Sequence, residues 1–118
     1  MQDRNTLAEA YLAAWNEPDI ASRRRLMERN WAEQARYADP MMQAEGRDGI
    51  AGMIEAARAS FPGHGFSLCG VPDGHGAFLR FGWVLALEGG APVARGSDVL
   101  RLDEEGRIAE VIGFLDAA

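Results

Sequence analysis

Apolar residues recur every three or four positions in three segments of the N-terminal half, which is the spacing of amphipathic helices. These segments cover about residues 6–16, 19–31 and 48–60. Thr6 and Glu9 have capping-box spacing at the start of the first segment, and Asp19 can cap the second. Trp31 falls on the inner side of the second segment. The pattern therefore predicts three helices before the middle of the chain.

After residue 65 the apolar positions alternate with polar ones, which is the spacing of β-strands. The predicted strands cover residues 66–71, 77–87, 93–102 and 107–115, with a further short strand at 35–40. Glycine-containing connections separate them, among them PDGHG at 72–76, and such connections are typical of hairpins. We expect a single domain over residues 1–118, of the α+β class, in which one mainly antiparallel sheet curves around the helices.

The strand predicted at 77–87 carries apolar residues on both faces. Phe81 and Trp83 fall on one face, whereas Phe78 and Val84 fall on the other. A sheet with one face against helices and the other in water alternates more cleanly than this. Either loops or a second subunit must cover the second face, and we expect a homodimer.

The strand predicted at 93–102 has a carboxylate on its apolar face. Asp98 alternates there with Gly96 and Leu100. Burial of an unpaired carboxylate costs free energy, so such a group is usually paired, hydrogen-bonded or protonated. Asp98 is therefore either part of a pocket or a structural residue bonded to a neighbouring strand, a tyrosine or an arginine.

Composition and charge exclude several classes of function. The net charge of −6 argues against a nucleic-acid partner, which needs a basic face. All twelve basic residues are arginine, so Schiff-base chemistry at a lysine is excluded. The single cysteine excludes an internal disulfide and a multi-cysteine zinc site. Arg23, Arg24 and Arg25 are expected on a solvated helix face. We see no signal peptide or membrane span and expect a cytoplasmic protein without a membrane partner.

The order of these parts resembles the nuclear transport factor 2-like superfamily, which includes ketosteroid isomerase, limonene epoxide hydrolase and SnoaL-type polyketide cyclases. The segments that carry the resemblance are AYLAAWNEPDI, RYADP, GRDGI, FPG and SDVLRLDEEGRIAEVIGFL. Together they extend over nearly the whole chain. The resemblance implies a cone-shaped fold, in which a curved antiparallel sheet of the cystatin-like roll type wraps around three N-terminal helices.

Within that superfamily the residues are most similar to ketosteroid isomerase. Tyr11 and Asp19 repeat a spacing found there, Asp39 stands before a proline like its general base, and Asp98 matches its second oxyanion donor. The resemblance implies proton transfer on a hydrophobic carbonyl substrate, of the isomerase or polyketide-cyclase type. In it Asp39 moves the proton while Tyr11 and a protonated Asp98 stabilise an oxyanion, without a metal or other cofactor. Ketosteroid isomerase is itself the reference case of a carboxylic acid kept neutral by an apolar site.

The remaining candidates are residues expected to contact a small hydrophobic ligand. They are Trp15, Phe61, His75, Arg80 and Phe114. His64 is expected in a surface turn. Each main candidate also has a structural interpretation, because Asp39 can be a turn residue and Tyr11 a core residue.

Two other functions remain open. A hydrolase resembling limonene epoxide hydrolase would need Arg80 between two carboxylates. A non-catalytic module of the same fold would use the cavity to bind a ligand or another protein.

Overall fold

The computed structural model describes residues 3–116 as three helices and six strands. The elements are α1 (Arg4–Asn16), α2 (Ile20–Asn30), β1 (Trp31–Ala38), β2 (Gln43–Glu45), α3 (Gly46–Ser60), β3 (His64–His75), β4 (Phe78–Leu87), β5 (Ala94–Leu102) and β6 (Ile108–Leu115). The α+β class and the curved sheet predicted from the sequence are confirmed. No helix of the described residues has the length and apolar character required to cross a membrane.

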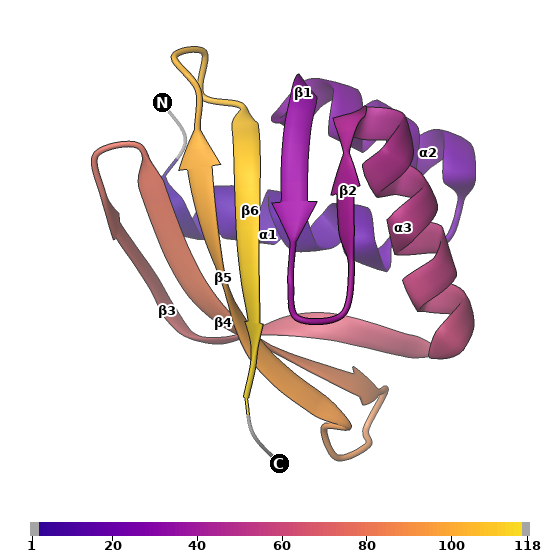
Figure 1. Cartoon of the computed structure of the whole chain (residues 1–118). Coiled ribbons are helices and arrows are strands. Elements are labelled where there is room, and N and C mark those ends of the chain that lie inside the picture. The colour runs from indigo at the N-terminus through magenta and orange to yellow at the C-terminus, as the bar shows by residue number, and fades with distance from the viewer. Residues whose placement is uncertain (1–2, 117–118) are drawn as a thin grey trace.

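The strands form one sheet in the order β2-β1-β6-β5-β4-β3. All neighbouring pairs are antiparallel except β1 and β6, which are parallel. Figure 1 shows this sheet bending around the helices, with α1 crossing one face and α3 beside β1 and β2. The concave face and the helices therefore enclose the apolar core.

The helix boundaries differ from the sequence prediction in two places. Asp3 caps α1, and its side chain accepts a hydrogen bond from the Thr6 amide at 2.7 Å, so the helix begins earlier than the Thr6 capping box suggests. Asp19 caps α2 as predicted, but this helix ends at Asn30. Trp31 is instead the first residue of β1, where it is fully buried. The sheet, which offers a large apolar residue more contact area, overrides the helical pattern.

The β3–β4 hairpin is longer than predicted. Strand β3 continues through the PDGH sequence to His75, with a register shift between Cys69 and Asp73. Only Gly76 and Ala77 form the loop, and Gly76 has a φ of +55°, as the first loop position of a type II′ turn requires. The shift lets the strand bend without losing its pairing with β4.

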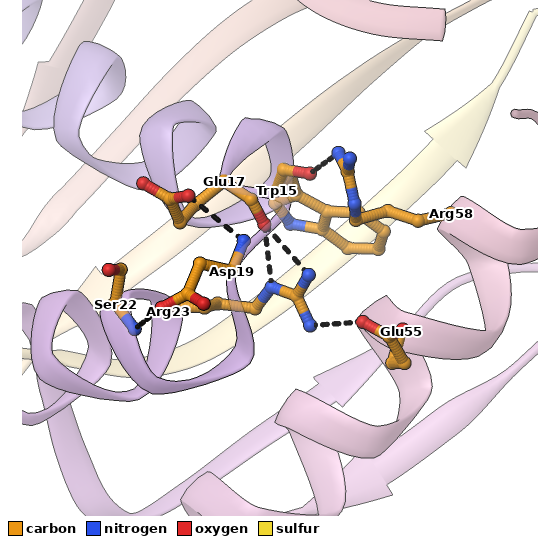
Figure 2. Close-up of polar contacts among 7 residues, drawn as sticks. All are labelled: Trp15, Glu17, Asp19, Ser22, Arg23, Glu55 and Arg58. Atoms are coloured by element: carbon orange, nitrogen blue, oxygen red, sulfur yellow. Dashed lines mark hydrogen bonds and ion pairs between the residues drawn. The ribbon is translucent and has the colours of Figure 1, made fainter. Parts of the chain in front are cut away.

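A buried arginine ties the connection between α1 and α2 to α3. The Arg23 side chain, which is 1% exposed, donates two hydrogen bonds to the Glu17 carbonyl and one to the Glu55 carboxylate, as Figure 2 shows. The expectation that all three consecutive arginines face solvent is therefore wrong for Arg23. Two of its donors satisfy the carbonyl group of Glu17, just beyond the end of α1, where the helix supplies no partner.

Candidate active site

A cavity of about 150 Å³ lies between α1, the end of α3 and the concave face of the sheet. Most of its lining is apolar and aromatic. The aromatic lining residues are Tyr11, Trp15, Tyr37, Phe61, Phe66 and Trp83. Its acidic lining residues are Asp39 and Asp98. An apolar cavity with a few convergent polar groups is the usual form of a small-molecule site.

Asp98 lies in the wall of this cavity, on the central part of β5. The Tyr11 hydroxyl donates to its Oδ2 at 2.7 Å, and the Trp83 indole donates to its Oδ1 at 3.2 Å. Burial raises the pKa of Asp98 to about 6, while the bonds from Tyr11 and Trp83 oppose the rise and the charge of Asp39 adds to it. Asp98 therefore takes up a proton at a higher pH than an exposed aspartate does.

Asp39 follows β1 directly and is held by its own turn. Its Oδ1 accepts hydrogen bonds from the amides of Met41 at 2.8 Å and Met42 at 2.9 Å, and its Oδ2 accepts one from the Tyr37 hydroxyl at 2.6 Å. These three bonds fix the carboxylate against the cavity. Because a carboxylate has about four acceptor positions, one position on Oδ2 stays open.

Gly113 on β6 separates the two carboxylates. Asp98 pairs with Gly113, and Ala38 pairs with Ile112, so the next residue after β1 stands beside Gly113. A Cβ atom at Gly113 would lie 2.9 Å from Asp98 Oδ1 and 3.1 Å from the Asp39 Cβ. The missing side chain therefore keeps open the space that both carboxylates face.

Two further polar lining residues, Arg58 and His64, come from the end of α3 and the start of β3. Arg58 donates to the Trp15 carbonyl at 2.9 Å and forms no ion pair with a carboxylate of the described residues. The His64 Nδ1 lies 3.1 Å from the Pro62 carbonyl, which fixes the ring against the turn. His64 follows the turn after α3 and is only partly buried, as expected, and it also lines the cavity.

Five of the residues singled out in the sequence line the cavity, and three do not. The five are Tyr11, Trp15, Asp39, Phe61 and Asp98. His75 is exposed beside the β3–β4 loop, and Arg80 pairs with Asp73 at 2.8 Å on the exposed side of the sheet. Phe114 is 54% exposed because the alternation that turns Gly113 inward turns Phe114 outward. These three residues, which the sequence suggested as ligand contacts, therefore lie outside this cavity.

Sequence reasoning missed Tyr37, Arg58 and the hydrogen bond from Trp83. Tyr37 had a readable signal, because it alternates with the buried Ala35 and stands two residues before Asp39. Arg58 had none, since a helical arginine near a glycine-containing turn is ordinary in sequence.

A family model described as the SnoaL-like domain matches residues 8–111. A crystal structure of a SnoaL-like family protein from Agrobacterium tumefaciens, provisionally described as an isomerase, is 56% identical, with a TM-score of 0.94 over 99% of this chain and 100% of that chain. No curated protein matches the sequence.

More distant structures share the fold alone. A protein from Sinorhizobium meliloti, provisionally described as a polyketide cyclase, is 16% identical, with a TM-score of 0.71 over 92% of this chain and 93% of that chain. A protein with a ketosteroid isomerase-like fold from Catenulispora acidiphila, solved with trimethylamine, is 17% identical, with a TM-score of 0.74 over 94% of this chain and 85% of that chain.

Proposed function

The chain belongs to the SnoaL-like family, and from this premise we propose that it is an isomerase acting on a small apolar carbonyl compound. The observation that carries the proposal is the meeting of two carboxylates and two tyrosine hydroxyls in a largely apolar cavity. A cavity of about 150 Å³ suits a single-ring compound, since apolar cavities of similar size take up benzene in other proteins.

The proposed reaction moves a double bond into conjugation with a carbonyl group. The open position on Asp39 Oδ2 accepts a proton from the carbon between the carbonyl and the double bond, and the electron pair of that C–H bond forms a dienolate. Asp39 then returns the proton to the far carbon of the former double bond. Atoms and charge balance without a metal or other cofactor, and the step is general-base catalysis.

Tyr11 is the proposed donor to the dienolate oxygen. Burial, and next the charge of Asp98, raise the pKa of Tyr11 well above its usual value, so the hydroxyl keeps its proton. When Asp98 is protonated it can donate to the Tyr11 oxygen, which frees the Tyr11 hydrogen for the substrate. The rate is therefore expected to fall as the pH rises through about 6.

The test is the conversion of 3-cyclohexenone to 2-cyclohexenone, followed by ultraviolet absorbance. Asp39→Asn should abolish turnover, and Tyr11→Phe should reduce kcat roughly a hundredfold, the typical effect of losing one oxyanion donor. Asp73→Asn is the control, because that carboxylate pairs with Arg80 away from the cavity. Equal rates for wild type and Asp39→Asn would remove Asp39 as the base.

Ligand binding without catalysis is the second candidate function. It is favoured by the three hydrogen bonds that already occupy Asp39, which is more than a mobile base needs. Binding of cyclohexanone without turnover of 3-cyclohexenone would select it. An epoxide hydrolase mechanism is not proposed, because Arg80 does not lie between two carboxylates.

We also propose that a second copy of the chain covers the outer face of the sheet. Phe78, Ile112 and Phe114 lie on this face and are 45%, 38% and 54% exposed. The sequence left two possible covers for this face, loops or a second subunit. No loop of the described residues covers these three side chains. A homodimer would remove this apolar surface from water.

A further inference from the structure

The indole N–H of Trp15 is a buried hydrogen-bond donor without an acceptor among the described residues. We propose that it donates to the oxygen atom of the ligand, as a second donor beside the Tyr11 hydroxyl. The inference rests on the proposed function, because it names a group that meets the carbonyl oxygen of the proposed substrate. The ligand class it implies is a small apolar compound with one exposed acceptor oxygen.

The position of Trp15 supports a ligand contact. Its side chain lines the cavity and is 4% exposed, and Nε1 has no partner among residues 3–116. A buried donor without an acceptor costs free energy, so such groups are rare and need an explanation. An acceptor that enters the cavity with the ligand would remove that cost.

The other two tryptophans provide an internal comparison. Trp83 also lines the cavity, but its N–H is already bonded to Asp98. Trp31 has a second unpartnered N–H within the described part of the chain, but Trp31 lies in the core and is not part of the cavity lining. Trp15 is thus the tryptophan whose free donor and cavity position occur together.

The Trp15 indole also lies near the Tyr11 hydroxyl. Tyr11 and Trp15 are four residues apart on α1 and both line the cavity, so their side chains lie on the same face of the helix. The geometry nevertheless forms no hydrogen bond between them. A ligand oxygen in this region can therefore accept from the Trp15 indole, and also from the Tyr11 hydroxyl when Asp98 is protonated and no longer accepts its hydrogen.

The indole is held in place before any ligand binds. Arg58 donates to the Trp15 carbonyl at 2.9 Å, as the dashed line in Figure 2 shows. The ring centroid lies 5.8 Å from that of Tyr37 and 5.3 Å from that of Phe66. A donor fixed in this way loses little entropy on binding and acts as a preorganised dipole.

Titration of ¹⁵N-labelled protein with two isosteric ligands tests the inference. The probes are cyclohexanone and methylenecyclohexane, which differ in the acceptor oxygen. The three indole N–H signals are assigned with single Trp→Phe variants. We expect cyclohexanone to move the Trp15 indole proton downfield, methylenecyclohexane to leave it nearly unchanged, and the Trp31 signal to stay in place with both.

Affinities provide the second readout. Trp15→Phe should weaken cyclohexanone binding by roughly three- to tenfold, the usual worth of one net hydrogen bond, and leave methylenecyclohexane binding unchanged. Methylenecyclohexane binding to the same variant is the matched control, because it reports any loss of cavity shape without involving an acceptor oxygen. If the chemical shift of the Trp15 indole proton stays the same when cyclohexanone binds to the wild-type protein, the inference is wrong. This result does not depend on whether the variant folds.

The outcome is separable from that of the proposed isomerase. If cyclohexanone shifts the Trp15 signal downfield but 3-cyclohexenone is not converted, the isomerase proposal is wrong and Trp15 is still supported as a ligand donor. If 3-cyclohexenone is converted but the Trp15 signal does not shift, the isomerase proposal is supported and the Trp15 inference is wrong.

Discussion

Tyr11 and Asp98 lie 87 residues apart in the chain, and the Tyr11 hydroxyl donates a 2.7 Å hydrogen bond to the Asp98 carboxylate inside the protein. Helix α1 supplies the donor and β5 the acceptor, so the bond joins the helical layer to the middle of the sheet. Asp98 is only 4% exposed. An ionisable group this deeply buried makes the stability of the fold depend on its proton.

We expect Asp98→Asn to remove one component of the pH dependence of stability. Because burial raises the pKa of Asp98 to about 6, above its ordinary 3.8, the native state binds this proton more tightly than the unfolded state. The contribution is present in full below about pH 4 and is lost as the pH rises through 6. Relative to Asp98→Asn, wild type should gain about 2–3 kcal/mol of unfolding free energy between pH 7 and pH 4.

Urea unfolding of both proteins at several pH values measures this difference. The comparison cancels the surface carboxylates, which the two proteins share. The amide side chain that Asp98→Asn introduces can still accept from Trp83 and donate to the Tyr11 oxygen, so the variant keeps a satisfied core. A constant difference between the proteins from pH 7 to pH 4 would show that Asp98 has an ordinary pKa in the native state.

The sequence predicts the fold and part of the site because periodicity records which side of an element faces inward. Alternation along β5 placed Asp98 on the apolar face, and the helical stripe of α1 placed Tyr11 on the inner side of its helix, where the structure buries both. The same reasoning extends to Gly113 on β6 once the register is known. Periodicity therefore identifies inward-facing residues, including the polar ones.

Periodicity does not say which inward or loop residues share one cavity. His64 and His75 both stand between glycines, yet the register of β3 with β4 puts them at opposite ends of a long strand, and only His64 reaches the cavity. Arg80 was ambiguous for the same reason, and its partner Asp73 became visible only through the register shift in β3. The pairing of distant strands decides these contacts, and the register of that pairing cannot be read from a single sequence.

Two glycine substitutions should have opposite effects. Gly113→Ala places a Cβ 2.9 Å from Asp98 Oδ1 and 3.1 Å from the Asp39 Cβ, so it should lower the unfolding free energy by about 1–3 kcal/mol and block ligand binding. Gly52→Ala on α3 meets no atom within 4 Å and should raise the unfolding free energy by about 0.5–1 kcal/mol through helix propensity.

Thermal unfolding and cyclohexanone titration of both variants check this contrast. Gly113→Ala with wild-type affinity would mean that the space between the carboxylates is not where the ligand sits. If Gly52→Ala also lowers the unfolding free energy, the loss in Gly113→Ala can no longer be assigned to the contacts of its Cβ atom.

Removing the buried arginine should cost much more than neutralising its partner. Arg23→Met leaves the Glu17 carbonyl without two donors, at a cost of roughly 1–3 kcal/mol. Glu55→Gln retains an acceptor at a side chain that is 50% exposed, so its cost should stay below about 1 kcal/mol. Chemical denaturation of both variants measures the ratio. Similar losses would indicate that the ion pair, and not the bonds to the Glu17 carbonyl, carries the stabilisation.

The proposed homodimer makes the outer face of the sheet sensitive to a single charge. Ile112 is the best probe because β6 is an inner strand of the sheet, and its neighbours across the register are Val99 on β5 and Ala38 on β1. A charge at this position would be buried without a partner in the dimer but hydrated in the monomer. Ile112→Arg should therefore dissociate the dimer without unfolding the chain.

Sedimentation equilibrium of wild type, Ile112→Arg and Ile20→Arg tests this directly. Ile20 is the matched control, since it is 54% exposed but lies at the start of α2, away from the outer face. We expect dimers for wild type and Ile20→Arg, and monomers for Ile112→Arg at the same concentration. A surface covered by a second copy of the chain must give the mass of a dimer. If wild type sediments as a monomer, the proposed homodimer is wrong.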